Sequence, residues 1–145
     1  ISSIRNIKAN FAISPKKEIS LVCKVDDSRA SILLNYKNYL ERLVKITSLE
    51  TGENIEKPSQ STTIVTSDME VYIPLKDLID IDKEIERLNN QILNLENRLK
   101  SVNNKLNNKQ FVSNAPEKIV DIEKDKKNRY EKEINILKDN LSSLE

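Results

Sequence analysis

The sequence of 145 residues contains no histidine and no tryptophan, and it has one cysteine and one glycine. Without histidine, catalytic triads and zinc sites have no material. A single glycine excludes a glycine-rich phosphate loop, and the lone Cys23 cannot form an internal disulfide. Paired carboxylates are plentiful, but they fall on the polar faces of predicted helices. We therefore predict no catalytic site, no metal site and no cofactor within this chain.

Other absences narrow the class further. No apolar run approaches the roughly 20 residues that a membrane span needs, and no signal peptide is recognisable. The net charge is only +1, so any binding of nucleic acid must come from local patches of charge. Hydrophobic residues make up 37% and charged residues 32%, a balance typical of an elongated coil. The chain opens at Ile1 inside a predicted helix, and we interpret it as a fragment of a longer protein.

A heptad pattern dominates the second half of the chain. Apolar residues recur at alternating steps of three and four, which predicts a helix with one narrow seam that needs a partner helix. These residues are Leu78, Ile81, Ile85, Leu88, Ile92, Leu95, Leu99, Val102 and Leu106. A second stretch, from about Pro116 to Glu145, has a seam of Ile119, Val120, Tyr130, Ile134, Leu137, Leu141 and Leu144. The short link between them, predicted to be non-helical over residues 107–115, makes the two helices antiparallel.

The seam of the returning helix is interrupted by charge. In register with Ile134, it places Glu123 and Lys127 opposite apolar residues of the first helix. The charged heads can reach water while their stems lie along the seam. We therefore expect the distal half of the arm to be held more weakly than its base. The antiparallel arrangement is also expected to place Leu95 near Tyr130.

The first half predicts a small α+β unit. A helix ends before Pro15, because proline disfavours a helical conformation in the residue before it. Alternation then predicts a strand with Cys23 on its apolar face, and a helix, a second strand and a hairpin follow. The predicted spans are a helix to Phe11, a strand over 18–25, a helix over 29–45, a strand from Ile46 and a hairpin over 62–73. The predicted fold is thus a strand–helix–strand–hairpin unit, residues 1–77, followed by a long antiparallel two-helix coiled coil, residues 78–145.

Two tyrosines on the first-half helix have two interpretations. Tyr36 and Tyr39, with Lys37, Arg42 and Lys45 nearby, could form a surface for stacking bases and binding phosphate. Tyrosines at such spacing more often pack a helix against a sheet with the hydroxyl at the edge. We favour packing.

Lysines and arginines gather toward the distal half of the predicted arm. They are Arg98, Lys100, Lys105, Lys109, Lys118, Lys124, Lys126, Lys127 and Arg129. Acidic residues are interleaved with them, so the patch is moderate. Charge alone favours an ordinary solvated face of a coiled coil.

Three stretches of the sequence resemble the C-terminal region of bacterial-type valyl-tRNA synthetases. They are IRNIKANFAISPKKEI from Ile4, MEVYIPLKDLIDIDKEIERL from Met69, and NKLNNKQFVSNAPEKIV from Asn104. The first resembles the helix that closes the anticodon-binding domain, the second the start of the terminal coiled coil, and the third its tip. Lys109 and Gln110 depart from the family pattern, which usually has an acidic residue and a glycine before the phenylalanine.

The resemblance implies a cytoplasmic, monomeric parent enzyme that joins valine to its tRNA using ATP and Mg²⁺. Its catalytic and editing domains are absent from this chain, which would therefore hold tRNA without catalysing the reaction. The family's arm lies against the outer corner of the L-shaped tRNA, and RNA helices are recognised mainly through phosphates, 2′-hydroxyls and shape. As candidate tRNA-binding residues we select Arg98, Lys105, Lys109, Lys126, Lys127 and Arg129.

Two other classes of function remain open. The apolar seam could serve a structural module that dimerises. A coiled-coil chaperone arm of prefoldin type also combines paired helices with small strands, but there the strands lie between the helices in the sequence, whereas here they precede both.

Overall fold

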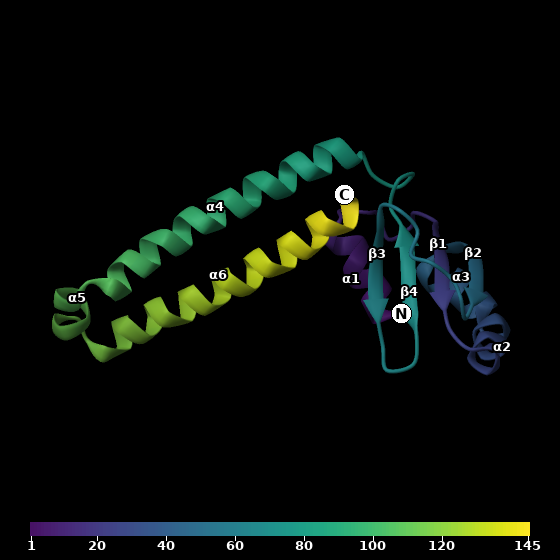
Figure 1. Ribbon diagram of the computed structural model, residues 1–145, viewed down its shortest axis with the longest axis horizontal. Helices are drawn as coiled ribbons and strands as arrows, with labels where there is room; N and C mark the ends of the chain where they lie inside the picture. Colours follow the sequence, from purple (N-terminus) through teal and green to yellow (C-terminus); the bar gives the residue numbers. More distant parts are fainter. The chain divides into compact units, whose positions relative to one another are not determined.

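The computed structural model describes residues 1–145, which form two compact units. Unit 1 contains Ile1–Glu84 with Ser143–Glu145, and unit 2 contains Ile85–Ser142. Unit 1 holds a mixed sheet and three short helices, and unit 2 is a helical hairpin (Figure 1). The fold class is α+β, as predicted.

Unit 1 is built on a four-stranded sheet of order β2-β1-β4-β3. The strands are β1 (Ile19–Lys24), β2 (Ile46–Gly52), β3 (Ser61–Val65) and β4 (Glu70–Pro74). Strand β2 is parallel to β1, whereas β4 is antiparallel to both β1 and β3. The predicted hairpin is therefore confirmed, and its second strand joins it to β1.

The helices of unit 1 cover one face of this sheet. They are α1 (Ser2–Asn10), α2 (Asp27–Asn35) and α3 (Lys37–Val44). The core they share with the strands includes Ile4, Ile19, Leu21, Cys23, Val44 and Ile73. Alternate residues of β1 point into it, because successive side chains of a strand lie on opposite faces. The prediction of a strand with Cys23 on its apolar face is confirmed, since Cys23 is 2% exposed.

The single helix predicted over residues 29–45 is wrong, because the structure has two helices that meet at Tyr36. The backbone of Tyr36 has φ −92° and ψ 4°, and its N–H donates to the carbonyls of both Ile32 and Leu33. The bond to Ile32 has α-helical spacing and the bond to Leu33 has the tighter 3₁₀ spacing, so α2 ends in a tightened turn at Tyr36. No proline or glycine lies near Tyr36, and the amphipathic pattern continues across the break. The sequence therefore does not reveal it.

A buried lysine joins three segments of unit 1. Lys8 of α1 is 4% exposed, and its Nζ donates to the carbonyls of Pro15 at 3.1 Å, Lys17 at 2.6 Å and Val44 at 2.8 Å. Burial, with a smaller contribution from the charge of Lys45, lowers the pKa of Lys8. All three protons of the ammonium are satisfied by backbone oxygens, so Lys8 has a structural role.

Unit 2 consists of most of two long antiparallel helices, which are joined at a helical tip. They are α4 (Ile81–Asn107) and α6 (Glu117–Leu144), with the short α5 (Lys109–Asn114) between them (Figure 1). Asp80 precedes α4, and its carboxylate caps the helix by accepting a hydrogen bond from the N–H of Lys83 at 3.2 Å. The non-helical link predicted over 107–115 is wrong. Asn108 caps α5 instead, because its side-chain oxygen accepts from the N–H groups of Gln110 and Phe111.

The seam of the arm follows the predicted heptads on α4. Ile92 and Val102 are 7% and 6% exposed, and Ile134 of α6 is 5% exposed. Both Ile119 and Val120 were predicted in the seam of α6. Val120 is 6% exposed, which confirms that prediction, whereas Ile119 is 42% exposed and lies outside the seam. Leu95 shares a groove with Glu133 and Leu137. The helices therefore meet about one turn further along α6 than the predicted pairing with Tyr130.

Candidate nucleic-acid interface

A buried carboxylate organises the cations of the distal arm. Glu123 occupies a seam position of α6, three residues after Val120, and is 6% exposed. Its Oε1 lies 3.5 Å from Nζ of Lys105 on α4 and 3.1 Å from Nζ of Lys126. The prediction that charge interrupts the seam here is confirmed. Two of the six candidate residues are thereby brought together around one carboxylate.

The environment of Glu123 keeps it ionised. The hydrogen bond from Lys126 lowers the pKa of Glu123, and the charges of Lys105 and Lys126 act in the same direction against the opposing effect of burial. Its second oxygen, Oε2, is buried and has no hydrogen-bond partner in the protein. A buried oxygen without a partner costs stability. The seam therefore contains one costly polar position close to the tip.

Four of the candidate cations lie on one side of the arm. On α4, Arg98 and Lys105 are seven residues apart, which places them on the same helix face. On α6, Lys126 and Arg129 follow at helical spacing and lead to Glu133, which lines a groove together with Arg98. We call these four residues, Arg98, Lys105, Lys126 and Arg129, the Arg98 face.

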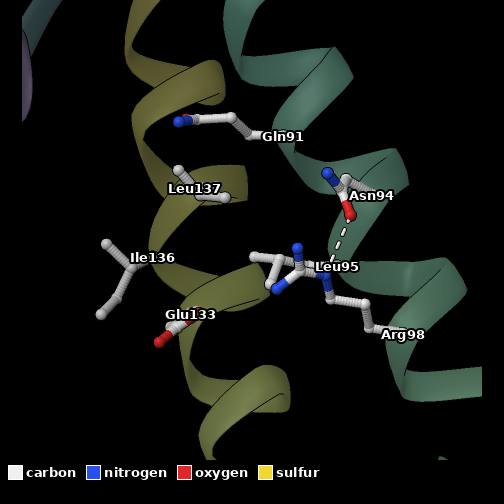
Figure 2. Close-up of a pocket in the computed structure, with 7 residues that line it drawn as sticks. All are labelled: Gln91, Asn94, Leu95, Arg98, Glu133, Ile136 and Leu137. Atoms are coloured by element: carbon white, nitrogen blue, oxygen red, sulfur yellow. Dashed lines mark hydrogen bonds between the residues drawn. The ribbon is translucent and has the colours of Figure 1, made fainter.

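The groove on this side is open and partly apolar. It has a volume of about 390 Å³ and is lined by Gln91, Asn94, Leu95, Arg98, Glu133, Ile136 and Leu137. Figure 2 shows Arg98 extending from α4 across the groove toward α6, with its Nε donating to Oδ1 of Asn94 at 3.1 Å. Ile136 lies on the far rim and is 54% exposed. The groove thus combines a positioned guanidinium with exposed apolar surface.

The remaining two candidates lie elsewhere. Lys127 is half-buried and lines a second hollow, of about 470 Å³, with Leu106, Val120 and Lys124. Its side of the seam is opposite to that of Lys126, because neighbouring residues of a helix diverge by about 100°. Lys109 is the first residue of α5, at the tip, and is exposed. The six candidates therefore form one face of four cations and two separate positions.

Some features of this surface were missed from the sequence. Ile122 is 42% exposed, and its helical spacing to Lys126 and Arg129 puts it on the same side of the arm as the Arg98 face. The guanidinium of Arg129 lies 5.3 Å from the centre of the Tyr130 ring, a distance typical of a cation–π contact. Both features depend on which residues of α6 are buried in the seam, and the heptad pattern alone does not determine that.

Two further properties bear on the kind of site. No group of three or more histidine, cysteine, aspartate or glutamate side chains is arranged to hold a metal ion. None of the helices combines the length and the apolar character required to cross a membrane. The arm nevertheless offers a cationic face on two stiff helices, an arrangement suited to phosphate contacts that position a ligand without reading its sequence.

Comparison with known proteins agrees with this description. Residues 80–145 match the family model described as the valyl tRNA synthetase tRNA binding arm. The chain is 32% identical over 145 residues to the valine–tRNA ligase of Syntrophotalea carbinolica, 37% to that of Staphylococcus saprophyticus and 39% to that of Latilactobacillus sakei. Each alignment covers 99% of this chain but only 16% or 17% of the relative.

By these alignments, the chain is similar to the C-terminal end of an aminoacyl-tRNA synthetase. Within that class, it corresponds to the C-terminal region of valyl-tRNA synthetases, and residues 80–145 match the part described as their tRNA binding arm. The resemblance found in the three sequence stretches is therefore confirmed.

Proposed function

We propose that this chain is the C-terminal segment of a valine–tRNA ligase and that its arm binds and positions valine tRNA. Residues 78–145 are the arm, which lies at the outer corner of the tRNA, and residues 1–77 are the end of the anticodon-binding region with the small α+β unit. The parent enzyme is cytoplasmic and monomeric and carries out ATP- and Mg²⁺-dependent aminoacylation in a catalytic domain outside this chain.

One observation carries the proposal: the segment that matches a tRNA-binding arm family presents four cations on one side. Arg98 and Lys105 come from α4, and Lys126 and Arg129 come from α6. Two antiparallel helices hold these groups at nearly fixed spacing, so their contacts with successive phosphates cost little conformational entropy. Exposed Ile122 and Ile136 on the same side supply apolar surface for ribose or for unstacked bases.

A dimerisation role is less favoured, because the seam of α4 is already covered within the chain. Leu88 and Ile92 are 0% and 7% exposed in the single chain. A second chain would have to displace α6 to use this seam. A molecular mass that stays constant with concentration is therefore expected.

The proposal is tested by measuring the affinity of the chain for a valine tRNA transcript as a function of salt. If about 3–4 phosphates are neutralised, the slope of log affinity against log salt is roughly −2 to −4. Arg98→Glu with Arg129→Glu removes two cations from the Arg98 face without touching the partners of Glu123. We expect a slope reduced by about 1–2 and at least tenfold weaker binding at low salt.

Lys100→Glu with Lys124→Glu is the matched control, with one change on each helix on the opposite side of the arm. Both lysines are exposed, so the two double variants differ in position and not in charge. If both double variants lose tRNA affinity equally, the effect is a general electrostatic attraction, and the Arg98 face is rejected as the binding surface. Absence of tRNA binding by the unchanged chain at low salt would reject the proposed role of the arm.

A further inference from the structure

The outer surface of α2 and α3 carries an uncovered aromatic strip. Ile32, Tyr36, Tyr39 and Leu43 follow at steps of four, three and four, and their exposed fractions are 56%, 57%, 60% and 48%. The ring centroids of Tyr36 and Tyr39 lie 5.8 Å apart, with 47° between the ring planes. The prediction that these tyrosines pack against the sheet is therefore wrong. Leu33 and Leu40 pack against the core from the inner side of the same helices.

Positive charge accompanies the strip. Between Ser28 and Leu49 the only acidic residue is Glu41, and its carboxylate lies 3.7 Å from Nζ of Lys37. Arg42 and Lys45 are exposed beside Leu43. The charge balance along this segment is therefore positive next to two exposed aromatic rings.

A hollow adjoins the Leu43 end of the strip. It has a volume of about 390 Å³, and Arg5, Ala9, Ile13, Pro15 and Leu43 contribute to its lining. The guanidinium of Arg5 donates to the carbonyl of Leu43 at 3.4 Å, which holds Arg5 at the rim. Lys8 also lines the hollow, but its ammonium is taken by backbone carbonyls. Arg5 is therefore the cation of this hollow that a ligand can approach.

We propose that the strip and its hollow form a second RNA contact, which binds unpaired nucleotides by stacking on Tyr36 and Tyr39. Arg42 and Lys45 would contact the phosphates, and Arg5 would contact a nucleotide at the hollow. Aromatic rings beside cations are the usual platform for single-stranded nucleic acid, because every base has a face that can stack. An apolar protein partner fits less well, since it would have to cover three cations with few acids nearby.

This contact lies within unit 1 and goes beyond the proposed function of the arm. It predicts that the chain binds single strands that have no helix for the arm to follow. A duplex of the same length offers no free base faces and should not engage the strip. The two contacts can therefore be tested separately.

The experiment titrates the full chain with a 12-nucleotide oligouridine and follows the intrinsic tyrosine fluorescence. The chain has four tyrosines and no tryptophan, so stacking on two of them should quench a large share of the signal. Tyr36→Ala with Tyr39→Ala should abolish that quench and weaken binding roughly 10- to 100-fold. Both side chains are mostly exposed, so this variant should retain the fold, as far-UV circular dichroism would verify.

Three further variants separate stacking from other causes. Tyr36→Phe with Tyr39→Phe keeps both rings and should bind within about threefold of the unchanged chain. Leu34→Ala alters an equally exposed apolar residue outside the strip and should have no effect. Arg98→Glu with Arg129→Glu should leave the oligouridine quench intact even where it weakens tRNA binding, so failure of one contact does not imply failure of the other. Equal affinity of the alanine variant, or no quench in the unchanged chain, would overturn the proposal and assign the strip to a protein partner.

Discussion

Replacing Glu123 with leucine should stabilise the arm, although it removes two ion pairs. The side chain of Glu123 is 7% exposed, so leucine at this position would gain about 1.5–3 kcal/mol from apolar burial. The change also removes the unpaired Oε2, which costs about 1–3 kcal/mol. Lys105 and Lys126 are 51% and 39% exposed, and they would return to water at a cost of about 0–1 kcal/mol each. Because these effects are not additive, we expect a net gain of about 1–4 kcal/mol.

The gain should be local to the distal arm. Hydrogen exchange of the amides in the first three turns of α6 measures local opening there. A gain of 1–4 kcal/mol corresponds to exchange that is slower by about 5-fold to several hundred-fold. Glu131→Leu is the control, because Glu131 is exposed on the same helix and its replacement should change stability by no more than about 0.5 kcal/mol.

The pH dependence gives a second readout of the same site. The pKa of Glu123 is lowered in the folded state. The ion pairs of the Glu123 carboxylate therefore contribute fully above its unfolded-state pKa near 4.5. Their contribution is lost as the pH falls through the folded-state pKa. The leucine variant should lack this acid-dependent component. Faster exchange in the leucine variant would falsify the reasoning, because it would mean that the ion pairs stabilise the arm more than an apolar seam does.

Three further predictions concern unit 1. Lys8→Met should destabilise unit 1 by about 1–3 kcal/mol, because three backbone carbonyls, including the buried one of Val44, lose their side-chain donor; urea unfolding that is unchanged would contradict this. Asp26 caps α2, and hydrogen bonds from Ser28 and Arg29 lower its pKa to about 2, so the cap should weaken as the pH falls from about 4 to 2. Circular dichroism should show this acid-dependent loss of helix in the unchanged chain and not in Asp26→Asn. A loss that persists in Asp26→Asn would show that the cap is not its source. Burial raises the pKa of the Cys23 thiol to about 11, so a thiol reagent at pH 8 should react only with unfolded chain, and rapid labelling of native chain would show that this core opens.

The elements with strong periodicity were predictable, and those set by local backbone geometry were not. The heptads, which run from Leu78 to Leu106, predicted α4, Ile81–Asn107, to within three residues, because a seam that needs a partner tolerates few alternatives. The alternation of apolar and polar residues around Cys23 identified β1, because only a strand with one buried face gives that pattern. The break at Tyr36 and the tip helix α5 arise from short-range hydrogen bonds. Such bonds leave the apolar pattern unchanged, so no periodicity reports them.

The candidate interface was predictable by region and not by side. The sequence placed the cations in the distal arm, but the division of Lys126 and Lys127 between opposite sides depends on which residue enters the seam. Val120 enters it and Ile119 does not, a difference of 100° around the helix. From the sequence, Tyr36 and Tyr39 were considered as a stacking surface, and packing was favoured instead, because exposed tyrosines are less common than packed ones.

The helical tip makes the length of the arm an adjustable quantity. Because α5 closes the hairpin with its own cap at Asn108, the tip does not depend on the number of turns beneath it. Adding seven residues to α4 and seven to α6 would extend the reach by about 10 Å while every seam residue keeps a partner. Adding them to one helix alone would shift the two seams past each other. Changes in reach are therefore expected as matched pairs of insertions, one in each helix, around a tip of constant size.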